Sequence, residues 1–199
     1  MAFIHTIPED EASTEVQEMY DKNLQAQGYI PNYAKVFSHR PQVMAAWSNL
    51  LGSIRSNMDT RRYELVTLAA ARALKSSYCM LAHGSILQAK FYSTEQMNLI
   101  AQDYHTAELT PAEVAMMAFA EQVVWDATAV TQQDIEALRT HGFSDAEIFD
   151  ITTTATARCF FSKTLDALGA QPDEIYLKLD EDLRQTLTIG RPISGQIQE

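Results

Sequence analysis

The sequence predicts an all-α fold of about eight to ten helices in a single domain spanning residues 1–199. Three observations predict this fold class. Apolar residues recur at three- and four-residue steps along most of the chain, which is the spacing of one helix face. Segments with this spacing begin at residues that favour helix N-termini. Only 7 glycines and 6 prolines are present, which is too few for a turn-dense all-β fold.

Residues 1–58 are predicted to form an N-terminal helical lead-in. Its first helix begins at Ser13 or the next residue, and it ends before Gly28, a residue type that favours helix C-termini. A short helical piece is expected over residues 33–38. A longer helix over residues 41–56 has a proline in its first turn, where proline is well tolerated.

Residues 59–106 are predicted to hold the core motif helices. Asp59 or the threonine after it caps the first of them, and the stretch LVTLAAARAL is strong helix-forming sequence. A small polar step at residues 75–77 interrupts the pattern, and a second helix runs from there through CMLAHGSILQAKF. This break places Cys79 near a helix N-terminus.

Residues 107–188 are predicted to form the C-terminal helices. Three of their starts show the capping-box pattern, at Thr110, Thr131 and Ser144. The helix after Ser144 is long and ends near Leu168, with a glycine directly behind it.

The C-terminal end is predicted to consist of an acidic helix over residues 172–186 and a tail over residues 189–199. The tail has the appearance of an arm rather than a domain. Because no linker is long enough to separate independent units, we expect one folded domain.

The charge of the chain excludes several classes of function. The formal net charge is −11, so the long-range field repels nucleic-acid backbones and anionic membrane surfaces. No apolar run approaches the roughly 20 residues that a membrane span needs. The N-terminus turns acidic instead of forming a signal sequence. We therefore expect a soluble cytoplasmic protein that binds neither nucleic acid nor membrane.

The residues most able to carry chemistry are Glu64, Ser76, Cys79 and His83, at separations of 12, 3 and 4 residues. Cys79 and His83 form an i,i+4 pair, so their side chains lie on one helix face. A thiol reacts as the thiolate, which is favoured by a neighbouring imidazolium and by the positive end of a helix. If Ser76 is the N-cap, Cys79 lies in the first turn. Such a thiolate can attack a peroxide oxygen, giving a sulfenic acid that a second thiol must resolve.

Two other interpretations of this cluster are available. A lone cysteine in an alanine-rich helix is usually a small buried apolar residue, and a lone histidine is more often a hydrogen-bonded interior residue than a base. A zinc site needs three or four protein ligands, whereas Cys79 and His83 supply two and Glu64 a third. Elsewhere in the chain, Glu121 is expected on a solvated helix face, and Arg158 can pair with a carboxylate across an interface.

The segment YELVTLAAARALKSSYCMLAHGSIL resembles the core motif of the alkylhydroperoxidase D and carboxymuconolactone decarboxylase superfamily. In peroxidase-active members this motif runs Glu, then Cys-x-x-Cys, then His four residues after the second Cys. Glu64, Cys79 and His83 match those positions, whereas Ser76 replaces the first cysteine. The lead-in, the middle and the end of the chain also resemble the peroxidase-related branch of this superfamily. The resemblance therefore covers nearly the whole chain.

The resemblance implies compact all-α subunits that assemble as homo-oligomers, as dimers, trimers or hexamers, and that bind no metal and no flavin. In the dithiol members two cysteines cycle between thiols and a disulfide, Glu and His relay protons, and a lipoyl or thioredoxin-like partner supplies electrons. The hydroxyl of Ser76 cannot form that disulfide. Three routes remain: an external thiol resolves Cys79, Cys159 approaches Cys79 to within the roughly 7 Å between Cα atoms that a disulfide needs, or peroxide chemistry is lost.

The leading functional hypothesis is an antioxidant, thiol-dependent peroxidase that reduces hydroperoxides. Cys79 is then the nucleophile, His83 the base or charge partner, Glu64 the proton relay, and Ser76 a hydrogen-bond donor and helix cap. Two alternatives stay open. One is a decarboxylase-like lyase or isomerase that acts on a small carboxylated lactone through acid–base chemistry of His83 and Glu64. The other is a non-catalytic oligomeric relative.

Overall fold

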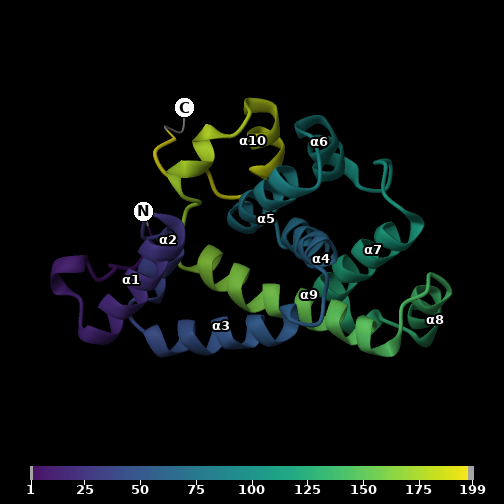
Figure 1. The fold of residues 1–199 in the computed structure, drawn as a ribbon, viewed down its shortest axis with the longest axis horizontal. Coiled ribbons are helices and arrows are strands. Elements are labelled where there is room, and N and C mark those ends of the chain that lie inside the picture. Colours follow the sequence, from purple (N-terminus) through teal and green to yellow (C-terminus); the bar gives the residue numbers. More distant parts are fainter. Residues whose placement is uncertain (1, 197–199) are drawn as a thin grey trace.

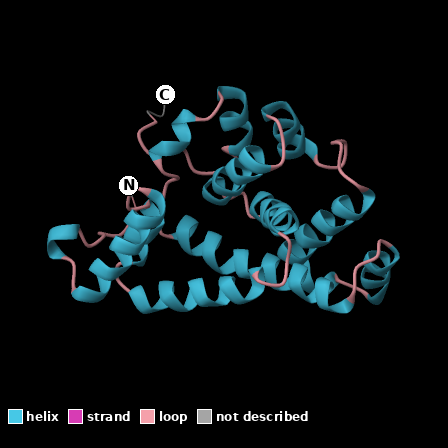
Figure 2. Ribbon diagram, viewed as in Figure 1, coloured by secondary structure: helices cyan, strands magenta, loops and turns pink. Residues whose placement is uncertain are grey.

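The computed structural model describes residues 2–196, and every regular element within them is a helix (Figure 2). The predicted all-α class is confirmed. The ten α-helices are α1 (Thr14–Gln27), α2 (Asn32–Phe37), α3 (Pro41–Arg55), α4 (Thr60–Ala73), α5 (Ser77–Lys90), α6 (Thr94–Asp103), α7 (Pro111–Asp126), α8 (Gln132–Thr140), α9 (Asp145–Ala167) and α10 (Glu181–Leu187). Three short 3₁₀ helices accompany them: η1 (Glu9–Glu11), η2 (Ala127–Ala129) and η3 (Glu174–Lys178). Within residues 2–196 no helix is both long and apolar enough to cross a membrane.

Helix α4 is the centre of the molecule and packs against α5, α7 and α9 (Figure 1). Every residue from 63 to 71 is buried, and Ala69, Ala70 and Ala71 are fully inaccessible. Because alanine adds little bulk to a helix, neighbouring helices can approach α4 closely on several sides. Helix α3 lies along α9, while α6 and α10 pack beside α5. The motif helices α4 and α5 are therefore held by contacts with each other and with α6, α7, α9 and α10.

Most of the predicted helix starts and ends are confirmed. Capping boxes are formed at Thr110, Thr131 and Ser144, and Gly28 adopts a left-handed conformation at the end of α1. The sequence reading missed α6, although a capping box at Ser93 opens it.

The C-terminal end differs from the prediction in two ways. The expected helix over residues 172–186 is split into η3 and α10, because Asp180 caps a new helix after η3 has ended. The tail is not a free arm over its described part, residues 189–196. Ile193 is fully buried there, and the Gly190 amide donates a hydrogen bond to Ser77 Oγ at 2.7 Å. Residues 197–199 of the predicted tail lie outside the described residues.

The break between α4 and α5 is held by this C-terminal segment. Lys75 has a left-handed backbone with φ of 55°, which ends α4 before the next helix starts. A Cβ atom on Gly190 would lie 2.1 Å from the Lys75 carbonyl oxygen, so only glycine permits this approach. The start of α5, which carries Cys79, is thus fixed by the turn at Lys75 and by the C-terminal segment at Gly190.

Candidate active site

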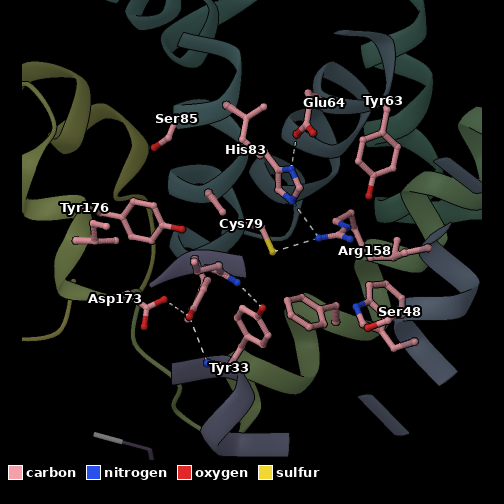
Figure 3. Close-up of a pocket in the computed structure, with 18 of the residues that line it drawn as sticks. Tyr33, Ser48, Tyr63, Glu64, Cys79, His83, Ser85, Arg158, Asp173 and Tyr176 are labelled. Carbon is pink, nitrogen blue, oxygen red and sulfur yellow. Dashed lines mark hydrogen bonds and ion pairs between the residues drawn. The ribbon is translucent and has the colours of Figure 1, made fainter. Parts of the chain in front are cut away.

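A cavity of about 840 Å³ lies between α3, α4, α5, α9 and η3. Cys79, His83 and Glu64 all line it, so the structure brings three of the four predicted site residues together (Figure 3). Most of the remaining wall is aromatic or aliphatic. The aromatic lining residues are Tyr29, Tyr33, Trp47, Tyr63, Tyr78, Phe161 and Tyr176.

Cys79 lies in the first turn of α5, as predicted, because that helix begins at Ser77. Its side chain is only 1% exposed. Two side chains of α9 donate hydrogen bonds to its sulfur: Ser162 Oγ is 3.1 Å from Sγ, and Arg158 Nη1 is 3.9 Å from Sγ. Arg158 and Ser162 are an i,i+4 pair, so one face of α9 presents both to the thiol.

His83 is held between a carboxylate and a guanidinium. Its Nδ1 lies 2.5 Å from Glu64 Oε2, and its Nε2 lies 3.1 Å from Arg158 Nη1. A guanidinium can only donate, so Nε2 accepts this bond and the ring proton resides on Nδ1, which donates to Glu64. The chain of contacts runs from Glu64 through His83 and Arg158 to Cys79 (Figure 3).

The protonation of His83 differs from the sequence-based picture of an imidazolium beside the thiol. Burial lowers the pKa of His83, and the positive charges of Arg158 and Arg55 lower it further, against the opposing effect of Glu64. The imidazole is therefore neutral at neutral pH. The positive charge next to the sulfur belongs to Arg158.

Arg158 is a buried cation without a carboxylate partner among residues 2–196. It is 3% exposed, and its Nε–H has no hydrogen-bond partner in this part of the chain. Its guanidinium carbon lies 5.2 Å from the ring centre of Trp47 and 5.5 Å from that of Phe161. Cation–π contacts of this kind compensate only part of the cost of burying a charge. An anion at the cavity, either the Cys79 thiolate or a ligand, would supply the rest.

Ser76 does not occupy the place that the sequence assigned to it. It is the N-cap residue of α5 by position, but its hydroxyl makes no capping hydrogen bond. The side chain is fully buried and does not line the cavity. It faces Asp166, whose pKa is raised by burial and lowered to a smaller extent by Ser76. The hydroxyl group that contacts the Cys79 sulfur comes from Ser162 instead.

Cys159 lies outside the cavity wall. It follows Arg158 directly, so its side chain is rotated by about 100° around the axis of α9. It is half-buried, both cysteines are free thiols, and burial raises the pKa of Cys159. The structure therefore does not bring Cys159 into the cavity with Cys79.

Arg158 and Ser162 are the site residues that sequence reasoning missed. Arg158 was considered only as one half of an ion pair across an interface, which is not the role that its contacts show within one chain. The available signal was a charged residue and a hydroxyl four positions apart on a helix face that is otherwise mostly apolar. The other buried residues of that face are Ile148, Ile151, Thr154, Ala155, Ala157, Phe161 and Leu165.

The described residues contain no group of three His, Cys, Asp or Glu side chains placed to hold a metal ion. What the cavity does offer is a nucleophile, a fixed cation and a hydroxyl donor around one sulfur atom. Such an arrangement can stabilise a thiolate and the charge that develops when it attacks an electrophile.

Comparisons with known proteins agree with this picture of the fold and motif. Residues 41–122 match the model of the carboxymuconolactone decarboxylase family. This segment includes Glu64, Cys79 and His83, and it ends before α9 begins. No curated protein sequence matches the chain.

Several solved structures share the fold at low sequence identity. A peroxidase-related protein with an alkylhydroperoxidase D core from Ralstonia eutropha JMP134 has 22% identity and a TM-score of 0.79, covering 88% of this chain and 94% of that one. A peroxidase-related protein from Silicibacter sp. TM1040 has 20% identity and a TM-score of 0.77, covering 87% and 95%. The debrominase Bmp8 has 16% identity and a TM-score of 0.71, covering 92% and 96%.

The fold and the motif together define the class of protein: an all-α protein with the alkylhydroperoxidase D-like fold. The match of residues 41–122 to that family model and the shared fold agree with the resemblance to the alkylhydroperoxidase D and carboxymuconolactone decarboxylase superfamily that the sequence predicted.

Proposed function

We propose that this protein is a thiol-dependent peroxidase in which Cys79 reduces an organic hydroperoxide. One observation carries the proposal: the buried guanidinium of Arg158 has no carboxylate partner in the described chain and lies against the Cys79 sulfur. A thiolate on Cys79 balances that charge, and a thiolate is the reactive form. The match of residues 41–122 to the carboxymuconolactone decarboxylase family and the fold shared with peroxidase-related proteins are consistent with such an activity.

In the reaction, the Cys79 sulfur attacks the terminal oxygen of the hydroperoxide. A sulfur–oxygen bond forms as the oxygen–oxygen bond breaks, which oxidises Cys79 to a sulfenic acid and reduces the hydroperoxide to an alcohol. The proton that leaves the thiol is matched by the proton that the departing alkoxide takes up. Arg158 stabilises the thiolate and then the negative charge on the departing oxygen, while the Ser162 hydroxyl holds the sulfur in place.

His83 and Glu64 act in this proposal as positioning residues. The Nε2 lone pair of His83 accepts a hydrogen bond from the Arg158 guanidinium. His83 therefore fixes the position of Arg158 and does not remove the thiol proton of Cys79. Glu64 in turn fixes the tautomer of His83. The proton-relay role that the family resemblance implies for the pair would require Arg158 to turn away from Nε2.

Cys79 is resolved by an external thiol in this scheme, because Ser76 has no thiol and Cys159 lies outside the cavity. One thiol attacks the sulfenic acid and releases water, giving a mixed disulfide. A second thiol then attacks that disulfide, which frees Cys79 and leaves the reductant oxidised. A lipoyl or thioredoxin-like dithiol can supply both thiols.

The decarboxylase-like lyase is supported less well by the geometry. That reaction requires His83 to act as a base through Nε2, which accepts a hydrogen bond from Arg158. It also gives no role to the contact between Arg158 and Cys79.

The test is reduction of cumene hydroperoxide with dithiothreitol as reductant, for the wild type and for Cys79→Ser. We expect the variant to lose the catalysed rate, and we expect a sulfenic-acid trapping reagent to label Cys79 in the wild type after one equivalent of hydroperoxide. Equal rates in the two proteins, or a wild type that forms no sulfenic acid, would overturn the proposal. Turnover of a carboxylated lactone that survives in Cys79→Ser and is lost in His83→Ala would establish the lyase instead.

A further inference from the structure

The cavity is much larger than a small peroxide needs. Its volume of about 840 Å³ falls within the range of roughly 300–1,000 Å³ that is typical of sites for organic ligands. A molecule the size of water occupies only about 30 Å³ of liquid volume, so hydrogen peroxide would leave most of the cavity unfilled. The walls can therefore contact a bulky organic group.

The wall near Cys79 carries a cluster of aromatic rings. Trp47 and Phe161 are stacked with ring centres 5.2 Å apart and an interplanar angle of 9°, and Tyr33 meets Phe161 edge-on at 5.6 Å. Aromatic rings prefer offset and edge-to-face arrangements, so a further ring can join this cluster by edge contacts. The shape and chemistry of this wall favour a planar aromatic body.

The charges on the cavity wall favour an anion. Three cationic side chains line the cavity, Arg158 in its interior and the exposed Arg55 and Lys178 at its edge. Neither Arg55 nor Lys178 forms an ion pair with a carboxylate in the described part of the chain. Arg55 packs over the Tyr63 ring at 5.4 Å. Its charge also contributes to the lowered pKa of His83, after burial and Arg158.

The two carboxylates of the wall already have partners. Glu64 accepts from His83, while Asp173 accepts from the hydroxyls of Tyr78 and Tyr29 and from the backbone amide of Asn32. These donors orient both carboxylates, and neither carboxylate forms an ion pair with Arg55 or Lys178 in the described part of the chain. The three cations of the wall outnumber its two carboxylates, so while Cys79 is a thiol the lining carries a formal excess of positive charge, which favours anions in a chain with a net charge of −11.

We propose that the cavity binds an organic anion with an aromatic body, and that the substrate is an aromatic hydroperoxide that carries a carboxylate. The carboxylate is held at the edge by Arg55 and Lys178, the ring packs among Trp47, Phe161 and Tyr33, and the hydroperoxide faces Cys79. The choice of a hydroperoxide rests on the proposed function. The preference for an aromatic anion rests on the wall alone.

Binding is tested without turnover, in the reduced protein, by calorimetric titration with 3-phenylpropionate and its neutral match 3-phenylpropionamide. We expect the acid to bind about tenfold more tightly than the amide, since exposed ion pairs each contribute modestly.

The double variant Arg55→Gln/Lys178→Met should lose most of this difference in affinity between the acid and the amide. Lys90→Met removes one charge from an exposed lysine outside the cavity and should retain it. Equal affinities for acid and amide, or a double variant that binds as the wild type does, would overturn the proposal.

Fluorescence locates the bound probe. Trp47 lines the cavity and Trp125 is 67% exposed, so Trp125→Phe leaves Trp47 as the one tryptophan and as a reporter of occupancy. We expect saturable quenching by 3-phenylpropionate and weaker quenching by 3-cyclohexylpropionate, which lacks the flat ring. Unchanged emission at concentrations that saturate the calorimetric signal would place the probe elsewhere and overturn the assignment.

Kinetics then connect binding to chemistry. We expect kcat/KM for 4-carboxycumene hydroperoxide to exceed that for cumene hydroperoxide by about tenfold, and the gap to close in the double variant. If the protein reduces neither compound while acid and amide still bind with different affinities, the peroxidase proposal fails and the anion site stands. If both are reduced equally and binding shows no preference, the anion site fails and the peroxidase proposal stands.

Discussion

Two arginine sites near the central helix differ in how their charge is balanced. Arg72 of α4 lies over the Tyr104 ring and reaches Glu121 of α7, with 3.7 Å between Nε and Oε1. Tyr104 donates a further hydrogen bond to Glu121 at 2.8 Å. Arg158 of α9 also lies over an aromatic ring, that of Trp47, but it faces a thiol and a neutral imidazole instead of a carboxylate.

The comparison separates a structural site from the proposed reactive one. At the Arg72 site both charges are on the chain, and their contacts join α4 to α7. Glu121 is 5% exposed there, so its predicted place on a solvated helix face was wrong. At the Arg158 site the positive charge is in place and the negative charge is left to a thiolate or a ligand. A buried cation without a carboxylate partner lowers the stability of the fold, but it can stabilise an anion that forms or binds beside it.

The largest effect should come from Arg158→Met. The substitution removes the cation beside Cys79 while keeping a long apolar side chain against Trp47 and Phe161. We expect hydroperoxide reduction to fall by about a hundredfold, the cost typical of losing one preorganised charge-stabilising donor. Because an unbalanced buried charge is also removed, the free energy of unfolding should stay within about 1 kcal/mol of the wild type. Steady-state assays and urea unfolding measure the two quantities, and a stable variant with full activity would contradict the role given to Arg158.

Arg72→Met should show the opposite pattern. It leaves Glu121 buried without its ion-pair partner, so we expect a loss of about 2 kcal/mol in the free energy of unfolding, reduced from the fully buried case because Arg72 is one-third exposed. Activity per folded molecule should change less than about twofold, since Arg72 is outside the cavity wall. Adding Glu121→Gln should recover part of the lost stability. If Arg158→Met lost stability while the free energy of unfolding of Arg72→Met stayed at the wild-type value, the roles given to the two arginines would be contradicted.

A smaller effect is expected from the pH dependence of His83. Burial lowers its pKa in the folded protein, so below the ordinary value of about 6.5 the unfolded chain binds a proton that the folded chain excludes. This contribution to stability is full above pH 6.5 and is lost as the pH falls. Urea unfolding at pH 7.5 and 5.5 should therefore show a larger decrease for the wild type than for His83→Gln. The exposed His141→Gln is the control, and identical decreases in wild type and His83→Gln would contradict the assignment.

The smallest effect is expected from Cys159→Ser. Since Cys159 lies outside the cavity, the rate of hydroperoxide reduction with dithiothreitol should change less than about twofold. Intact-mass measurement after oxidation with one equivalent of hydroperoxide should show no disulfide between Cys79 and Cys159 in the wild type. A disulfide-linked product, together with slower turnover in Cys159→Ser, would restore Cys159 as the resolving thiol.

The sequence by itself determined most of the helices and the motif. Capping boxes such as the one at Ser144 act within one helical turn, and the i,i+4 relation of Cys79 and His83 follows from helix geometry alone. These local rules also placed Cys79 in the first turn of α5. The homo-oligomer, the cytoplasmic location and the external reductant stay predictions.

Only the tertiary structure decided which charge meets the thiol. Arg158 and Ser162 contact Cys79 across sequence separations of 79 and 83 residues, a pairing that follows from how α9 packs beside the motif helices. The same packing buries His83, which removes its charge, and directs Ser76 away from the cavity. Burial and long-range contacts of this kind have no local sequence signature. Spacing thus identified the candidate nucleophile, while packing supplied its neighbouring cation, its hydroxyl partner and the walls of the cavity around it.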